Sequence, residues 1–454
     1  MGLHGPDGLT VKAGPGLRGL RVWMRVLGCR SNLCEGDLLA GDLEARGALI
    51  SREPDGCRAA ILLTCSVTAE ADRKCRQMTR RARRAVGKSG FVAVCGCWAQ
   101  SLDAAEAEAL GIDLLVGNRR KSLLADAVEA RIRDPEKRAL TDLRMSAAGM
   151  AGNTEWDELP MRGPVLHTRA FLKIQEGCDH FCAYCVVPFL RGRPVSRSAK
   201  KVLEDVRRLV DAGCREVVLT GIHLGLYGRG METSLADLVR TLSDVSGLER
   251  LRLGSLEPFA LDGALLDALA DSPAFCRHLH LPLQSGDDGV LARMRRGYTA
   301  DGFARVCDAA RERLGGDLHI SSDILVGFPG EDSRAFQNTL SLMRRVGMGR
   351  THVFPFSPRH GTLAAGFEGR VGAAVLAERA AMASALGGEL LGHYARRFVG
   401  RTADVLAEEE RDGRGSGYTR QFLGVSWPGG GEPGNIVRVR VSSESEGALE
   451  GCLA

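Results

Sequence analysis

The amino-acid sequence predicts an α/β protein that ends in a small all-β module. Short β-rich runs at 21–28, 59–64, 91–96 and 114–118 alternate with helix-like stretches, and a similar strand–helix unit then recurs about six times further along the chain. After residue 395 the pattern changes: NIVRVRVSS alternates apolar residues with arginines, and PGGGEPGN is rich in turn formers. These observations predict two α/β regions followed by a β module of about 55 residues.

The first α/β region contains helix-like stretches such as DLLAGDLEARG and ADRKCRQMTRRARRAVG between its strands. Strands that alternate with helices predict a parallel sheet, because parallel neighbours need a crossover connection. The alternation fades in RDPEKRALTDLRMSAAGMAGNTEWDELPMRGP, residues 133–164, which we interpret as a linker.

The second α/β region predicts a partial or full βα barrel, whose chemistry lies at the C-terminal ends of the strands. Between the strands, VLEDVRRLVDAG has apolar residues at helical spacing, and Gly213 fits its C-terminal cap. The expected strands are FLKIQE (171–176), EVVLT (216–220), RLRLGS (250–255), HLHLPLQ (278–284), HISSDILVGF (319–328) and THVFPF (351–356).

Composition narrows the class of protein. The 454 residues suit about three domains, and no apolar run approaches the 18 residues of a membrane span, so we expect no membrane partner. The glycine-rich leader MGLHGPDGLTVKAGPGL has no apolar core, which predicts a flexible tail rather than a secretory signal. Without an export signal, 14 cysteines indicate thiolates used as metal ligands or nucleophiles rather than disulfides. The net charge of +5 is only a mild basic excess.

The strongest motif is C-x3-C-x2-C, formed by Cys178, Cys182 and Cys185 directly after the first expected barrel strand. Three thiolates on one loop can hold three irons of a 4Fe-4S cluster and leave the fourth iron open to a small molecule. Structural zinc is the main alternative, but it normally has four ligands, and no second cysteine pair lies nearby. Three unrelated buried cysteines are the remaining alternative.

Three N-terminal cysteines also follow expected strands. Cys29, Cys65 and Cys97 come just after RVWMRVLG, AAILLT and FVAVCG, and the carboxyl ends of parallel strands meet at one edge of a sheet. We therefore expect a second three-thiolate cluster site there, with a purely structural role for all of these cysteines as the alternative. The other cysteines differ in position: Cys57 precedes its strand, Cys75 lies in a polar helix, and Cys95 is inside its strand as a small packing residue. Cys34 lies about one turn into another helix and is a minor alternative as a substitute ligand.

The sequence resembles the radical S-adenosylmethionine (SAM) methylthiotransferases, and within them the MtaB group, from about residue 21 to the C-terminus. The motifs are RAFLKIQEGCDHFCAYCVVPFLRGRPVSR, VVLTGIHLGLYG, HLHLPLQSGDDGVLARMRRGYT, SDILVGFPGE and HVFPFSPRHGT, together with LGCRSN, LLTCSVTAEADRK and GCWAQ. The resemblance implies a Rossmann-like methylthiotransferase N-terminal domain (20–135) with an auxiliary cluster. It also implies a partial (β/α)6 radical SAM core (164–395) and an OB-like TRAM domain (396–454).

By the same resemblance, the cofactors are two 4Fe-4S clusters and SAM. The glycine loop TGIHLG and the other strand ends occupy positions where such enzymes bind SAM, although a loop of this kind is by itself more often an ordinary turn. Arg191 and Arg193 could pair with a carboxylate or phosphate, or could be solvated loop charges. The candidate SAM-binding residues are Tyr184, Gly221, His223, Ser255, Glu257, Gln284 and Ser285, and no catalytic side chain is assigned beyond the cluster ligands.

Two basic features predict RNA contact. In ADRKCRQMTRRARRAVGK, four arginines share a helix face that could contact phosphates, although such a stripe is often only solvated. The C-terminal module adds outward arginines on one strand, but its run Glu408–Glu410 is acidic. The candidate RNA-binding residues are Arg73, Arg76, Arg80, Arg84, Arg438 and Arg440.

The resemblance implies a cytoplasmic enzyme that adds a methylthio group to C2 of N6-threonylcarbamoyladenosine next to the tRNA anticodon. One cluster splits SAM into methionine and a 5′-deoxyadenosyl radical, and the auxiliary cluster carries the sulfur. The partners are tRNA, a reductant protein and a sulfur source. Two alternatives within the class are isopentenyladenosine in tRNA and an aspartate of a ribosomal protein. A non-catalytic iron–sulfur RNA-binding protein is the alternative from another class.

Overall fold

The computed structural model describes residues 16–134, 139–159 and 168–454, and it confirms the α/β class with a terminal β module. Residues 1–15, most of the expected flexible leader, lie outside the described residues. The chain divides into two compact units: residues 1–166 with 189–193, and residues 167–188 with 194–454. The boundaries of the three expected domains stay a prediction. Among the described helices, none is long and apolar enough to cross a membrane.

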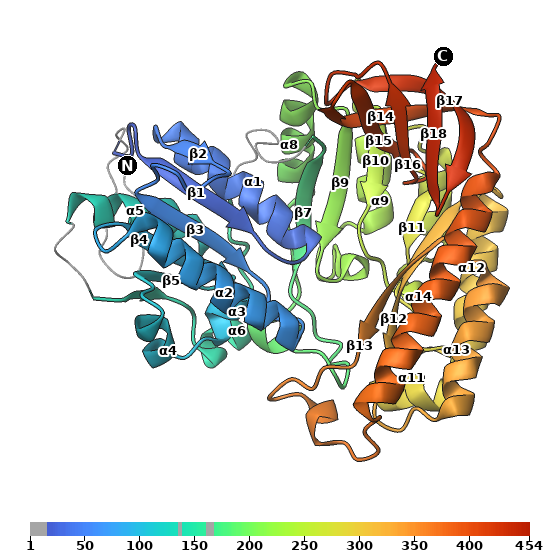
Figure 1. The fold of residues 1–454 in the computed structure, drawn as a ribbon, viewed down its shortest axis with the longest axis horizontal. Coiled ribbons are helices and arrows are strands. Elements are labelled where there is room, and N and C mark those ends of the chain that lie inside the picture. Colours follow the sequence, from blue (N-terminus) through green and yellow to red (C-terminus); the bar gives the residue numbers. More distant parts are fainter. Residues whose placement is uncertain (1–15, 135–138, 160–167) are drawn as a thin grey trace. The chain divides into compact units, whose positions relative to one another are not determined.

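The first unit is built on a six-stranded parallel sheet in the order β2-β1-β3-β4-β5-β6 (Figure 1). The linker interpretation of 133–164 is wrong in part, because Thr141–Leu143 pairs with β5 as the edge strand β6 and a short helix follows. The strands are β1 (Arg21–Val26), β2 (Leu49–Ser51), β3 (Ala59–Thr64), β4 (Phe91–Gly96), β5 (Leu114–Val116) and β6. The helices are α1 (Arg30–Ala45), α2 (Ala69–Val86), α3 (Cys97–Ser101), α4 (Ala104–Ala109), α5 (Leu124–Arg133) and α6 (Ala147–Gly152).

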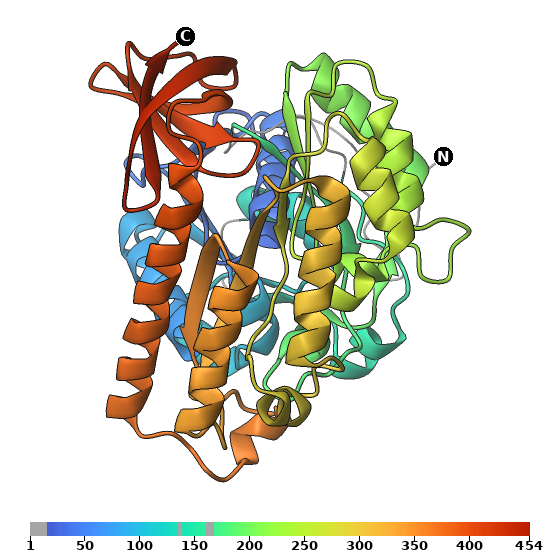
Figure 2. The same cartoon turned by 90° about the vertical axis from the view of Figure 1, so that its right-hand side faces the viewer.

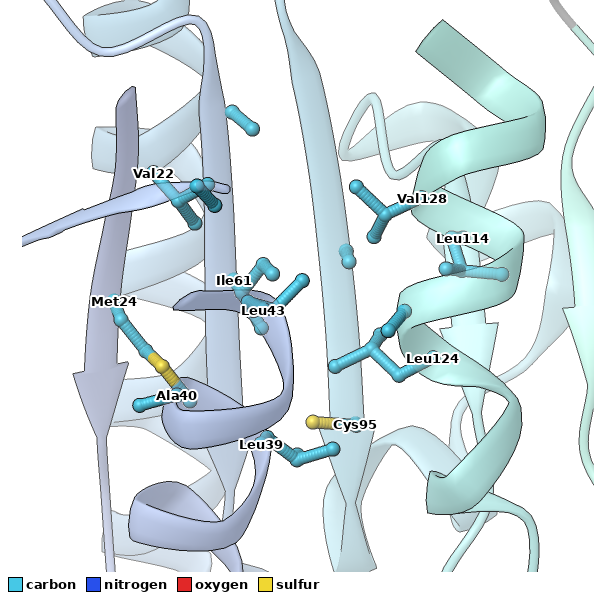
Figure 3. Close-up of a cluster of buried hydrophobic side chains, with 14 of the residues drawn as sticks. Val22, Met24, Leu39, Ala40, Leu43, Ile61, Cys95, Leu114, Leu124 and Val128 are labelled. Carbon is cyan, nitrogen blue, oxygen red and sulfur yellow. The ribbon is translucent and has the colours of Figure 1, made fainter. Parts of the chain in front are cut away.

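Both faces of this sheet are buried, as is typical of parallel sheets. Alternate residues of β3 and β4 point to opposite sides: Ile61 and Cys95 pack with α1 and α5, whereas Leu62 and Val94 pack on the other side with α2. Figure 3 shows the first cluster, with the Cys95 sulfur among Leu39, Leu124 and other apolar side chains. This burial leaves only the strand ends available for chemistry.

The second unit contains the six expected barrel strands, each followed by helical segments that lie along the sheet (Figure 2). The strands form two sheets, β10-β9-β7-β8 and β11-β12-β13, and isolated parallel bridges such as Ser255 to His280 connect them. This is the expected partial barrel. The strands are β7 (Ala170–Glu176), β8 (Val195–Ser196), β9 (Glu216–Gly221), β10 (Arg250–Leu253), β11 (His278–His280), β12 (His319–Val326) and β13 (Arg350–Pro355). The helices are α7 (Val187–Arg191), α8 (Ala199–Asp211), α9 (Leu235–Ser243), α10 (Gly263–Asp271), α11 (Asp288–Met294), α12 (Ala300–Leu314), α13 (Ser333–Val346) and α14 (Ala373–Arg396).

The C-terminal module is a closed barrel in the order β14-β15-β16-β18-β17, which confirms the small all-β prediction. Its core surrounds the fully buried Trp427, and Tyr394 in the last turn of α14 and Phe398 just after that helix complete the core. Closure leaves no long unpaired edge on the module. The strands are β14 (Thr402–Arg411), β15 (Arg414–Thr419), β16 (Gly424–Pro428), β17 (Ile436–Ser445) and β18 (Ala448–Leu453).

A buried ionic network attaches this module to the N-terminal ends of the βα-barrel strands. Glu216, the first residue of β9, accepts a hydrogen bond from Arg252 Nε at 2.9 Å and pairs with Arg250 at 3.4 Å. The two arginines also donate to main-chain carbonyls of the module, Arg250 to Asp404 at 2.7 Å and Arg252 to Thr419 at 3.4 Å. The module therefore lies at the opposite ends of the strands from the C-x3-C-x2-C loop, which follows the C-terminal end of β7.

Candidate metal centres

Cys29, Cys65 and Cys97 meet at the carboxyl edge of the first unit's sheet. Cys29 is the N-cap of α1 after β1, Cys65 follows β3, and Cys97 begins α3 after β4. Burial, together with the nearby thiols of Cys97 and Cys29, raises the pKa of Cys65 to about 12. The three residues are thus close enough to influence one another's charge, as the strand ends predicted, although their assignment as cluster ligands stays a prediction.

Two glycines allow this close approach. Gly28 precedes Cys29 and has φ +102°, and a Cβ there would lie 2.4 Å from the Cβ of Cys65. Gly96 precedes Cys97 and has φ +101°, and a Cβ there would lie 2.4 Å from the carbonyl oxygen of Thr64. A side chain at either position would strain the backbone and push the strand ends apart. The G-C pairs of LGC and CGC are the sequence signal for this requirement.

Arg191 is the main residue of this site that sequence reasoning did not place. The segment 189–193 belongs to the first unit, and the Arg191 side chain is buried there. Its guanidinium donates hydrogen bonds to Cys97 Sγ at 3.1 Å and to Asn32 Oδ1 at 3.0 Å, and it pairs with Glu35 at 3.3 Å. For Arg191, pairing with a carboxylate is confirmed, and a thiol is a further partner, whereas Arg193 is exposed and the described residues show no carboxylate paired with it.

The other N-terminal cysteines differ in their distance from this edge. Cys95 is fully buried in the sheet core, and its thiol donates to the Leu62 carbonyl at 3.5 Å, so its packing role is confirmed (Figure 3). Cys75 lies closer than its place in a polar helix suggested: its thiol donates to the Cys65 carbonyl at 3.4 Å, and Cys97 contributes to raising its pKa. Cys34 is buried inside α1.

Cys178, Cys182 and Cys185 lie on the loop after β7. Burial, together with the nearby thiols of Cys182 and Cys178, raises the pKa of Cys185 to about 12. The turn is tight: Phe181 has φ +47°, and the Cys185 amide donates to the Cys182 carbonyl at 3.0 Å. One loop thus brings the three thiols together, as the spacing predicted.

Arg296 contacts a sulfur of this loop, as Arg191 contacts a sulfur of the first site. It is buried, it donates to Cys182 Sγ at 3.3 Å, and it forms an ion pair with the predicted SAM residue Glu257. Its position in MRRGYT carried no obvious signal of this contact. Each cysteine set therefore has one buried arginine that donates a hydrogen bond to one of its sulfurs.

The spacing of both cysteine sets suits a cluster better than a single ion. Sulfurs that share one tetrahedral zinc lie about 3.8 Å apart, because each Zn–S bond is about 2.3 Å long. Within the described ranges, groups of three metal-binding side chains whose ligand atoms all lie within 4.8 Å of one another include neither cysteine set. Each set offers three free thiols that are too widely spaced for one shared ion, together with a cationic donor, and this fits the three protein ligands of a 4Fe-4S cluster.

Three of the seven predicted SAM residues, Tyr184, His223 and Glu257, lie near the C-x3-C-x2-C loop. Tyr184 packs edge-on against Phe328. His223, whose amide donates to Gln175 Oε1 at 2.7 Å, lies with His180 and Phe259 in one aromatic group. Gly221 ends β9, and a Cβ there would lie 3.0 Å from the Gln175 side chain.

The remaining SAM candidates, Ser255, Gln284 and Ser285, differ in their backbone and side-chain contacts. Ser255 bridges to His280 through the main chain, and Gln284 adopts φ +71°. Ser285 is fully buried, and its hydroxyl contacts Thr339 Oγ1 at 3.4 Å and accepts the Asp287 amide at 3.2 Å. Ser285 therefore supports the turn that begins α11. All seven assignments to SAM stay predictions.

The predicted RNA stripe on α2 is only partly available. Arg73 pairs with Glu70 at 2.7 Å, and Arg76 pairs with Glu106 at 2.5 Å. Arg80 and Arg84 are exposed and form no ion pair within the described residues. In the C-terminal barrel, Arg438 and Arg440 are exposed on β17, as expected, while Glu408 of the acidic run is tied to Arg169 at 2.5 Å.

Comparison with known proteins connects the two sites to one family. Residues 172–343 match the radical SAM superfamily, and residues 21–117 match the uncharacterized protein family UPF0004. The chain is 35% identical to the threonylcarbamoyladenosine tRNA methylthiotransferase MtaB of Bacillus subtilis, over 84% of each chain. The MtaB of Thermotoga maritima is 32% identical over 95% of this chain and 97% of its own length. The chain belongs to the radical SAM methylthiotransferase family.

A further relative of this methylthiotransferase has a different named product. The tRNA-2-methylthio-N(6)-dimethylallyladenosine synthase of Syntrophotalea carbinolica is 33% identical over 92% of this chain and 96% of its own. Among solved structures, the radical SAM methyltransferase TsrM of Kitasatospora setae superposes with a TM-score of 0.56 at 17% identity, covering 74% of this chain and 75% of that one, which shows a shared fold. Membership of the family brings two 4Fe-4S clusters and SAM as cofactors.

Arg296→Met is expected to lower the reduction potential of the cluster that we predict on the C-x3-C-x2-C loop. Hydrogen bonds to ligand sulfur raise the potential, and a charge-assisted bond is worth about 1.5–3 kcal/mol, which is on the order of 100 mV for one electron. The measurement is a redox titration followed by electron paramagnetic resonance (EPR), with Arg295→Met as control because that neighbouring side chain is exposed. Equal potentials in the two variants, at full iron content, would show that Arg296 does not tune the cluster.

Proposed function

We propose that this methylthiotransferase adds a methylthio group to C2 of N6-threonylcarbamoyladenosine next to the anticodon of tRNA. The observation that carries the proposal is the pair of three-thiol sites, one at the edge of the first unit's sheet and one after β7. A methylthiotransferase needs one cluster to generate a radical from SAM and a second to supply sulfur, and each site fits one cluster. The MtaB relatives support the choice of nucleoside.

The side chains of the chain itself have holding and positioning roles. Cys178, Cys182 and Cys185 would hold the SAM-binding cluster, which when loaded supplies a radical able to remove hydrogen from an unactivated C–H bond. Arg296 would orient the Cys182 sulfur while it also holds the Glu257 carboxylate. At the first site, Arg191 would orient the Cys97 sulfur in the same way. Each set of three sulfurs would then keep its geometry when the metal is lost and restored.

The proposal implies the partners of a cytoplasmic tRNA-modifying enzyme: tRNA, a reductant protein and a sulfur source. Of the six candidates, the exposed Arg80 and Arg84 on α2 and Arg438 and Arg440 on β17 are best placed to neutralise phosphates, because the described part of the chain gives them no ion pair closer than the 4.0 Å between Arg438 and Asp404. Arg73 and Arg76 would first have to give up carboxylate partners.

The substrate is tested by nucleoside mass spectrometry of tRNA from a strain that lacks the gene. We expect the methylthio mark to disappear from threonylcarbamoyladenosine and to return when the intact gene is restored. Loss of the mark from isopentenyladenosine alone would assign the enzyme to the other named group of relatives. Unchanged tRNA, combined with absence of SAM cleavage by the reduced protein, would favour a non-catalytic iron–sulfur protein.

Iron content tests the two-site assignment independently of the substrate. Protein purified without oxygen should contain about eight irons, and the Cys178/Cys182/Cys185→Ala triple variant should contain about four, because the other cluster has its own ligands. Colorimetric iron and sulfide determination provides the measurement. A triple variant that kept nearly all of its iron would contradict the assignment.

A further inference from the structure

Three side chains inside the βα barrel form a group that neither cluster uses. Among the described residues, His280, Asp323 and His352 place one possible ligand atom each within 4.8 Å of the other two. The three side chains differ in access to solvent: His280 is buried, Asp323 is partly exposed, and His352 is exposed.

Strand register brings the three residues together. β12 pairs in parallel with both β11 and β13, so that His280 lies opposite Ser321 and Asp323 lies opposite His352. Ser321 and Asp323 are two residues apart on β12 and point to the same face of the sheet. The group is therefore built into the strands of the barrel, on elements far more rigid than a loop.

The buried histidine is already held in the orientation that a metal ligand requires. His280 Nδ1 contacts Ser321 Oγ at 2.9 Å, and the same hydroxyl contacts His278 Nε2 at 2.8 Å. This leaves His280 Nε2 directed at the Asp323 carboxylate, 3.3 Å away. In metal sites, the second nitrogen of a ligating histidine is almost always bonded in this way, which fixes the ring and its tautomer.

We propose that His280, Asp323 and His352 bind one divalent transition-metal ion of the zinc and iron(II) class. Two imidazoles and one carboxylate suit these ions, whereas magnesium and calcium prefer oxygen ligands alone. Three protein ligands are typical of sites that keep a coordination position open for water or a substrate oxygen. Because His352 is exposed, water or a substrate could reach the ion.

The proposal is tested with Co²⁺ on the holoenzyme, because the oxidised clusters are diamagnetic and the added ion can be followed by EPR. Protein with both clusters loaded is mixed with Co²⁺, passed through a desalting column and analysed for cobalt and iron. The wild-type protein should retain about one Co²⁺ in addition to its iron. His352→Gln and Asp323→Asn should each weaken Co²⁺ binding by more than about tenfold, because each removes a direct ligand.

The controls separate this site from other sources of binding. His360→Gln, which replaces an exposed histidine outside the group, should bind Co²⁺ like the wild type. Unchanged iron content in every variant would show that the clusters and the fold are intact. Two results would overturn the proposal. If the wild type retained no Co²⁺, His280 and Asp323 would be a simple hydrogen-bonded pair. If both ligand variants retained as much Co²⁺ as the wild type, the ion would be bound by free thiols.

Discussion

Cys97→Ala is expected to abolish methylthiolation and to remove about half of the iron, whereas Cys95→Ala should leave both largely unchanged. Cys97 lies past the end of β4, where its sulfur accepts a hydrogen bond from Arg191, and it is one of three thiols at the sheet edge. Cys95, two residues earlier, points into the apolar core between the sheet and helices α1 and α5 (Figure 3). Activity on undermodified tRNA and iron content give the measurement.

The two variants are matched, because they make the same chemical change two residues apart on one chain segment. Removing the buried sulfur of Cys95 leaves only a small cavity, whose cost is about 1 kcal/mol. A Cys97→Ala protein with full iron, or a Cys95→Ala protein that loses a cluster, would contradict the assignment of the pair.

Glu216→Gln is expected to destabilise the second unit by about 3–5 kcal/mol, which is the cost of removing one partner from a buried ion pair. The change leaves the buried Arg250 and Arg252 without their shared carboxylate, at the point where both arginines also bond the C-terminal barrel. Thermal unfolding and limited proteolysis of that barrel provide the measurement. The control is Glu249→Gln, because Glu249 forms an exposed pair with Arg215 that is worth at most about 1 kcal/mol. Equal melting of the two variants would refute the role of the network.

The depressed pKa of Glu216 predicts that the fold loses stability in acid. Burial alone would raise the pKa of Glu216, but the charges of Arg252 and Arg169 outweigh it and hold the pKa at about 2. A carboxyl group with a depressed pKa stabilises the fold above its ordinary pKa of 4.5, and that contribution is lost as the pH falls from 4.5 toward 2. A shift of this size corresponds to about 3 kcal/mol, and it should be missing from the Glu216→Gln variant.

The sequence alone was sufficient for the longer strands of both α/β regions, the barrel and the cysteine positions, but not for the short strands β2, β6 and β8. The spacing of apolar and polar residues along the chain reflects local burial, and it therefore locates the longer strands. The structure has the expected strands with boundaries that differ by a few residues, and the largest difference is at the end of β11. Because parallel strands end at one edge, the grouping of Cys29, Cys65 and Cys97 and the exclusion of Cys95 could be predicted without knowing the packing. The chemistry of C-x3-C-x2-C needed only its spacing.

Tertiary structure decided what depends on contacts between distant segments. The sequence suggested that Arg191 is a charge on a barrel loop, but its segment belongs to the first unit, where Arg191 contacts Cys97. Arg296 lies more than a hundred residues after Cys182, whose sulfur it contacts. The edge strand β6 looked like a linker, because a three-residue strand has too short a pattern to recognise. The group of His280, Asp323 and His352 comes from three strands whose register no local signal specifies, so only the folded barrel brings it together.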